Sequence, residues 1–200
     1  MEEIPPRPDV IVPGEKVYLG PIRRDLARVY QRWMNDLEVV VTLTVLRRVP
    51  LTEEDELDWF DAARRDTSSK MFTIYERPDD RPVGNIGLHE IDFQSGTSEV
   101  GIVIGERSVW GRGYATEALS LLVDYAFTVL GLNQVWLRYV AMNERARQVY
   151  DRVGFREAGR LREAVRVGQR RYDLVFMDLL AREFRSPVLA EKLRLPRDGA

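Results

Sequence analysis

The chain has 200 residues, 44% of them hydrophobic and 31% charged, which is typical of one globular domain with an apolar core. The lack of cysteine excludes disulfides, thiolate metal ligands and a cysteine nucleophile, and a single histidine disfavours a histidine-based zinc site. A net charge of −2 without a basic block, no membrane-length apolar run and no signal peptide predict a cytoplasmic protein that binds neither nucleic acid nor membrane.

The N-terminal half is predicted to hold an extended arm, two helices and three strands. Prolines make residues 1–15 an extended arm. Apolar residues at helical spacing predict a first helix over 26–33, and Thr52 followed by Asp55 predicts a capped second helix ending near residue 66. Strands are predicted at 71–76, 83–91 and 99–104, the last two forming a hairpin. The only histidine, His89, falls on this hairpin and is expected to be a packed or surface residue.

The sequence WGRGYATEA at residues 110–118 follows an apolar strand and opens a helix. Glycine lets the backbone pass close to a ligand, and the free N–H groups of a helix N-terminus attract anions. The loop therefore predicts a phosphate or pyrophosphate site. A plain tight turn is the alternative, because neither a complete G-x-G-x-x-G nor a P-loop G-K-[ST] is present.

The helix after this loop is predicted from one apolar stripe and a terminal glycine. Gly131 stands where a C-terminal glycine cap belongs. The stripe has the 3.6-residue period of a helix that packs on a core, and consists of Ala118, Leu121, Leu122, Tyr125, Ala126 and Val129.

A strand over 135–140 precedes a second short helix. Asn143 is a good N-cap for this helix, Gly154 ends it, and Ala146, Val149 and Tyr150 form its buried face. A second hairpin is predicted over 163–167 and 172–180, and residues 185–200 form a charged tail that packs on a neighbour or stays mobile. The order of elements predicts one α/β domain around a mixed, mostly antiparallel sheet.

The two motifs together resemble the GNAT superfamily of acyl-CoA N-acyltransferases. The second motif reads N-x-x-A-x-x-x-Y-x-x-x-G-F over residues 143–155, and the resemblance narrows to the RimJ/RimL-type branch, named for enzymes that acetylate ribosomal-protein N-termini. Residues 16–184 are covered, with further matches at 17–21, 33–36, 159–162 and 172–177. The wider superfamily usually has Gln or Arg at the position of Trp110, whereas Trp fits this branch.

The resemblance implies acetyl-CoA as acyl donor and no metal. The backbone of Trp110, Gly111, Arg112, Gly113, Tyr114 and Ala115 would hold the pyrophosphate. The family sheet splays between its two central strands, so an unpaired edge at Ile102, Val103 and Ile104 would bind the pantetheine arm as an added strand does. A backbone N–H here, with Val103 as candidate, would stabilise the tetrahedral oxyanion. Asn143 and Arg147 complete the expected cofactor contacts, although Asn143 also suits a plain N-cap.

Two residues match the positions of the family's proton-transfer groups. Tyr150 corresponds to the tyrosine that faces the thioester sulfur as general acid, and its alternative is an ordinary core aromatic. Glu99 corresponds to a frequent position of the base, acting directly or through water, and its alternative is a solvated carboxylate at a hairpin end. The implied reaction is direct transfer in a ternary complex.

The acceptor is the least specified part of the resemblance. The branch shapes its acceptor pocket with the first helix and the following loop, which indicates Trp33, Asn35, Asp36 and Thr42. Asp36 attracts a cationic amine or, equally, braces its own helix end. Protein N-termini and small amines are both plausible acceptors, and a homodimer is possible. Transfer of another acyl group such as succinyl, and a non-catalytic CoA-binding module, remain as alternatives.

Overall fold

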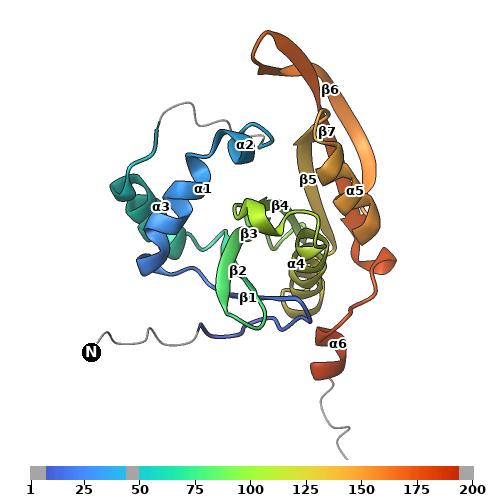
Figure 1. Cartoon of the computed structure of the whole chain (residues 1–200). Coiled ribbons are helices and arrows are strands. Elements are labelled where there is room, and N and C mark those ends of the chain that lie inside the picture. Colours follow the sequence, from blue (N-terminus) through green and yellow to red (C-terminus); the bar gives the residue numbers. More distant parts are fainter. Residues whose placement is uncertain (1–7, 44–49, 194–200) are drawn as a thin grey trace, which may run out of the picture.

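The computed structural model describes residues 8–43 and 50–193. One seven-stranded mixed sheet runs through the molecule in the order β1-β2-β3-β4-β5-β7-β6 (Figure 1). All neighbouring strands are antiparallel except β4 and β5, which are parallel. The predicted mixed, mostly antiparallel α/β domain is therefore confirmed. The strands are β1 Val17–Pro21, β2 Lys70–Glu76, β3 Arg81–Asp92, β4 Thr97–Ile104, β5 Gln134–Val140, β6 Arg156–Val167 and β7 Arg170–Leu180.

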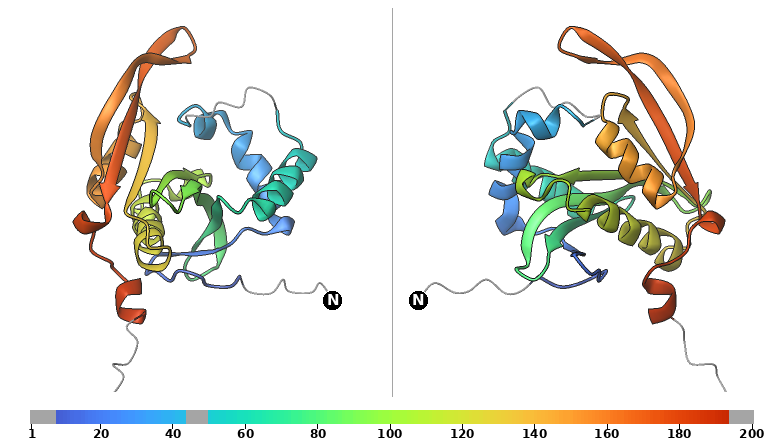
Figure 2. Two further views of the ribbon diagram at one scale, coloured as in Figure 1. Left: turned by 180° about the vertical axis from the view of Figure 1, so that it is seen from behind. Right: turned by 45° about the vertical axis from the view of Figure 1, so that its right-hand side comes forward.

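Helices cover both faces of the sheet (Figure 2). On one face lie α1 (Ala27–Met34), the short α2 (Leu37–Val40) and α3 (Glu53–Arg65); on the other lie α4 (Tyr114–Asp124) and α5 (Glu144–Val153). A buried hydrogen bond between the Tyr30 hydroxyl and Thr73 Oγ1 fixes α1 on β2. The apolar stripe of α4 packs on the opposite face as predicted. Short 3-10 turns occupy Arg24–Leu26, Arg107–Val109 and Ala181–Glu183.

The predicted helix caps are present. Thr52 and Asp55 form a reciprocal capping box at the start of α3, and Asn143 caps α5 by accepting a bond from Ala146 N–H. Gly154 ends α5 with φ +109, a left-handed conformation that favours glycine.

The end of the α4 stripe differs from the prediction. A π-helical turn occupies Tyr125–Val129 before Gly131, which has φ +67. Because a π turn holds more residues than an α turn, it rotates the following side chains out of the stripe. Val129 is consequently 46% exposed, while Ala126 remains buried.

The final hairpin is longer than predicted and projects beyond the rest of the domain (Figure 1). β6 begins at Arg156, whereas the residue pattern predicted a strand over 163–167 and the family resemblance matched a strand at 159–162. It is the outermost strand and its side chains are mostly exposed. Its charged residues therefore lack the alternating apolar pattern that marks a half-buried strand.

Both chain ends pack on the domain where the structure describes them. Val12 is fully buried and pairs with Leu19 of β1, so part of the predicted arm belongs to the fold. The buried Asp124 carboxylate accepts the N–H groups of Val188 and Leu189, just before and at the start of α6 (Leu189–Lys192). The predicted tail thus packs on its own chain as far as 193, and its remainder lies outside the described residues. Within the described residues, no helix has the length and apolarity needed to cross a membrane.

Candidate functional site

A cavity of about 910 Å³ opens between the two helical layers at the parallel strands β4 and β5. One end, called the donor end after the predicted cofactor loop, is lined by β4, the loop before α4 and one face of α5. The other, called the acceptor end after the predicted amine acceptor, is lined by α1, α3 and residues beside the turn of the β3–β4 hairpin. One continuous space therefore joins the predicted cofactor loop to the face of the sheet beneath α1 and α3.

The loop before α4 has the backbone geometry of an anion cradle. Gly111 and Gly113 have φ of +80 and +84, and a side chain at Gly111 would meet no atom within 4 Å. The first bond of α4 runs from Glu117 N–H to Gly113 O, so the amides of residues 114–116 have no partner within the helix. The buried Thr116 hydroxyl also lacks a partner among the described residues. Unpaired donors at a helix N-terminus fit a pyrophosphate.

Side chains from three parts of the chain hold and flank this loop. Trp110 Nε1 donates to Ile104 O at 2.9 Å, which ties the loop to the end of β4. The Arg145 guanidinium lies 5.6 Å from the Trp110 ring, and Lys16 Nζ donates to Arg112 O at 3.4 Å. Arg145 and Lys16 are basic groups near the cradle that the sequence reasoning missed. The sequence could have indicated Arg145, because it lies two residues after Asn143 within the second motif.

The predicted splay between the central strands is present. β4 pairs with β5 only at Thr97, Ser98 and Glu99, whereas its pairing with β3 continues to Ile104. From residue 100 onward the β5 side of β4 has no strand partner. Ile102, Val103 and Ile104 all line the cavity there. This open edge fits an extended amide-bearing ligand such as the pantetheine arm.

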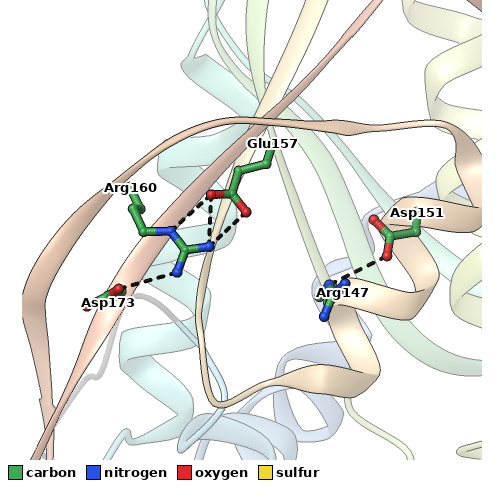
Figure 3. A network of polar contacts seen from close by, with 5 residues as sticks. All are labelled: Arg147, Asp151, Glu157, Arg160 and Asp173. Atoms are coloured by element: carbon green, nitrogen blue, oxygen red, sulfur yellow. Dashed lines mark hydrogen bonds and ion pairs between the residues drawn. The ribbon is translucent and has the colours of Figure 1, made fainter.

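The two cofactor residues predicted on α5 have different surroundings. Asn143 lines the cavity; its Oδ1 caps the helix, and its Nδ2 donates to Thr42 O at 3.4 Å across the cavity. Arg147 is absent from the cavity wall and is paired with Glu144 on the exposed side of α5. Its second partner there is Asp151 (Figure 3). The same figure shows Arg160 of β6 paired with Glu157 of the same strand and with Asp173 of β7. Arg145, two positions before Arg147, does line the cavity, because residues two apart face different sides of a helix.

Tyr150 lies on the cavity wall at the end of α5. It is 8% exposed, and its ring meets Tyr139 of β5 edge to face at 5.6 Å. Among the described residues its hydroxyl has no hydrogen-bond partner. Burial raises the pKa of Tyr150 to about 12, with a smaller contribution from Tyr139. The hydroxyl therefore stays protonated at neutral pH and is available as a proton donor.

Glu99 also lines the cavity, but it has a cationic partner. Arg138 Nε of β5 lies 2.9 Å from Glu99 Oε1, as an ion pair whose alignment falls short of a hydrogen bond. Glu99 is opposite His89 in the β3–β4 register, and His89 faces the same cavity. The sequence reasoning had treated His89 as an ordinary packed or surface residue.

Three of the four residues predicted for the acceptor have structural roles and do not line the cavity. Trp33 is buried against Gly105, and Asn35 exchanges two 2.8 Å hydrogen bonds with the Leu51 backbone. Asp36 caps α2 by accepting Glu38 N–H, in line with its structural alternative. Only Thr42 lines the cavity.

Residues from distant segments form the acceptor end instead. Its carboxylates are Glu56 of α3, which is 4% exposed, and Glu90 and Glu99 of the hairpin. Aromatic walls come from Tyr30 and Trp59. Because these residues are scattered along the sequence, no local motif marks them. The described residues contain no cluster of three or more metal-ligating side chains.

Comparisons with known proteins identify the family of this chain. Residues 16–156 match the family model described as "Acetyltransferase (GNAT) domain". The uncharacterized N-acetyltransferase p20 of Bacillus licheniformis is 26% identical over 85% of this chain and 96% of its own length. YdaF of Bacillus subtilis (strain 168), whose name assigns it provisionally to ribosomal N-acetylation, is 38% identical over 50% of this chain and 55% of its own length. The spermidine N(1)-acetyltransferase of Vibrio cholerae is 27% identical over 68% of this chain and 78% of its own.

A solved structure has the same fold. The spermidine N-acetyltransferase from Vibrio cholerae, solved in complex with CoA and spermine, superposes with a TM-score of 0.78 at 21% identity, covering 85% of this chain and 98% of the other. The region matched by the family model includes the splayed strands, the glycine loop and α5. The chain belongs to the GNAT family of acetyltransferases.

Proposed function

We propose that this protein transfers the acetyl group of acetyl-CoA directly to a primary amine that is positively charged at neutral pH. The observation that carries the proposal is the single cavity, with a backbone cradle at one end and carboxylates at the other. Donor and acceptor would meet at the splay between β4 and β5, where Tyr150 lines the wall. No covalent enzyme intermediate is needed.

Each part of the donor end has a distinct task in this proposal. The free amides of residues 114–116 and the Thr116 hydroxyl bind the pyrophosphate. The unpaired edge of β4 at 102–104 binds the extended arm and places the thioester in the splay. Tyr150 then gives its proton to the departing sulfur, and its high pKa keeps that proton in place until transfer.

The acceptor end is proposed to select a cation. Glu56, Glu90 and Glu99 give this end of the cavity carboxylates that attract an ammonium group. Among the relatives, the named acceptor of the Vibrio cholerae enzyme is spermidine. We therefore place small polyamines first among acceptors, with protein N-termini as the alternative that the RimJ/RimL resemblance implies.

Two further statements belong to the same proposal. The cytoplasmic location stays a prediction from the sequence. A homodimer also stays a prediction; its support is that β6 ends the sheet order and leaves an outer strand edge open to pairing. Sedimentation of the purified full chain tests the second statement.

A thiol-release assay with an amine panel tests the proposed reaction. Calorimetry with acetyl-CoA, succinyl-CoA and CoA comes first, and we expect binding. In the thiol-release assay, acetyl-CoA should be the preferred substrate. Turnover is expected with cationic amines and should be weak with amines that carry a carboxylate. The proposal would be overturned if acetyl-CoA, succinyl-CoA and CoA all failed to bind, or if no amine were acetylated.

A further inference from the structure

On the face of the sheet that carries α1 and α3, two glycines next to the splay leave room for neighbouring side chains: Met71 lies over Gly87 and His89 over Gly101. Gly87 of β3 and Gly101 of β4 are directly opposite each other in the register. At the next facing position on each strand stand His89 and Glu99, which also pair. Residues two apart on a strand share a face, so these two glycines, His89 and Glu99 all lie on the same face of the sheet. Three of them, His89, Glu99 and Gly101, line the acceptor end of the cavity.

The His89 ring lies over Gly101. A methyl group added at Gly101 would sit 2.9 Å from His89 Nε2 and 3.3 Å from Cδ2, closer than such contacts normally allow. The ring nitrogen is therefore held against the part of β4 where the splay has begun. This is the region in which the proposed function places the thioester and the attacking amine.

A β-bulge follows the histidine. The register of β3 and β4 shifts between His89 and Asp92, and Glu90 adopts φ +50, an uncommon conformation for a residue with a side chain. Bulges next to active sites re-aim side chains. Here the hydroxyl of Ser98 donates to His89 O at 2.8 Å, which fixes the backbone at the start of the bulge.

The charges around His89 suit a proton acceptor. Burial lowers the pKa of His89 below its ordinary value, while Glu99, Asp66 and Glu90, in that order, act in the opposite direction. Arg138 of β5, which is ion-paired with Glu99, is a cationic group on the same cavity wall. The imidazole is thus neutral at pH 7, and carboxylates stand ready to stabilise its protonated form.

Glu99 has a fixed position beside the histidine, because its Oε1 lies 2.9 Å from Arg138 Nε and its backbone is paired with that of His89. Its position fits the support of a neighbouring imidazolium.

We propose that His89 is the general base that removes a proton from the acceptor amine, with Glu99 as its positioning and charge-stabilising partner. This inference rests on the proposed function. The ammonium R–NH3⁺ gives one proton to His89 Nε2, and the free amine nitrogen attacks the thioester carbon. The C–N bond forms and the C–S bond breaks, with the sulfur taking one proton from Tyr150. The nitrogen loses a second proton, which restores the Tyr150 hydroxyl through solvent, and His89 passes its own proton to solvent, so that amide, thiol and one free proton result.

The single histidine makes the test direct, because one imidazole signal titrates in the NMR spectrum of the full chain. We expect the acid limb of the pH profile of kcat/KM to coincide with the titration of that signal, below pH 6.5. Rate is lost as pH falls through this pKa, since protonated His89 accepts no proton. His89→Gln should remove the limb and lower kcat by about 100-fold, within the range of general-base catalysis. Its affinity for acetyl-CoA should not change.

Two further variants separate His89 from Glu99 and from misfolding. Glu99→Gln removes the stabilising charge, so both the NMR titration of His89 and the acid limb should move to lower pH. His89→Ala should regain rate when imidazole is added, provided that its melting temperature shows a folded chain. Full activity of His89→Gln with an unchanged limb would overturn this inference alone. Lack of any turnover by the unmodified protein would overturn the proposed function and this inference together.

Discussion

The two ends of the cavity are built in different ways. The donor end is made mainly of backbone: the open edge of β4, the amides at the start of α4 and two glycines with positive φ. The acceptor end is made of side chains that α1, α3 and the β3–β4 hairpin bring together from distant parts of the sequence. A backbone site depends on glycine and helix-start positions and accepts many flanking residues. A side-chain site can change its ligand by single substitutions while the fold is kept.

This contrast predicts that donor and acceptor affinities respond to different substitutions. The largest effect is expected at the glycine loop. Gly113→Val introduces a branched side chain at φ +84 where the phosphates must approach, and should weaken acetyl-CoA binding by at least about 100-fold, equal to about 2.7 kcal/mol. Calorimetry measures the change. Gly131→Val is a matched control, because Gly131 has φ +67, has open space around it and lies away from the cavity. Equal loss in both variants would show a general effect of strain.

Tyr150→Phe should separate chemistry from binding. Loss of the proton donor is expected to lower kcat by about 100-fold with little change in acetyl-CoA affinity. Tyr125→Phe removes a hydroxyl from an aromatic pair outside the cavity and should leave kcat unchanged. Because the pKa of Tyr150 is raised to about 12, its deprotonation should not limit the rate between pH 6 and 9. An unchanged kcat in Tyr150→Phe would remove the tyrosine from the mechanism.

Glu56→Gln should affect the acceptor alone. Removing this carboxylate is expected to raise KM for a cationic amine by about 10-fold, or about 1.4 kcal/mol, with no effect on acetyl-CoA binding. Steady-state kinetics with both substrates varied measures each effect. Glu54→Gln, an exposed carboxylate on the same helix, is the control. A weakened donor affinity in Glu56→Gln would contradict the division between the two ends.

The smallest effect is expected at the cap of α3. Thr52→Ala breaks the capping box and should cost about 1 kcal/mol of stability, measured by urea unfolding. Since α3 carries Glu56 and Trp59, any effect of this variant on kinetics should be a change in the KM for the acceptor amine. Acetyl-CoA affinity that falls as much as acceptor affinity would show that the two ends are mechanically coupled.

The contrast between a backbone site and a side-chain site explains which parts of the cavity could be predicted from the sequence. The glycine loop and the cap at Asn143 were predictable, because each belongs to a contiguous motif with its own backbone geometry. The splay and the position of Tyr150 followed from the family resemblance. Thr116 stands inside the glycine-loop motif, yet its role depends on a hydroxyl left unpaired by the fold. Arg147 was predicted at the cofactor although Arg145 faces Trp110, because the direction of a helix face depends on packing.

Most residues of the acceptor end could not be predicted from the sequence. Trp33 and Asn35 stand in a recognisable motif, but their side chains hold α1 and the following loop in place. Glu56 and His89 line one cavity only because the fold brings α3 and the β3–β4 hairpin to the same end of it. The register of β3 and β4, which brings His89 beside Glu99, includes a bulge that no turn residue in the sequence marks. Long-range packing, and not local propensity, therefore determines this part of the site.

Hydrogen exchange measured with and without CoA tests the central claim most directly. If the backbone at the donor end binds the cofactor, amide exchange should slow on β4 at residues 100–104 and on the loop and helix start at 111–116. Exchange in α3 should remain unchanged, because the acceptor end is made of side chains and CoA does not reach it. Unchanged exchange in both donor segments at saturating CoA would contradict the account.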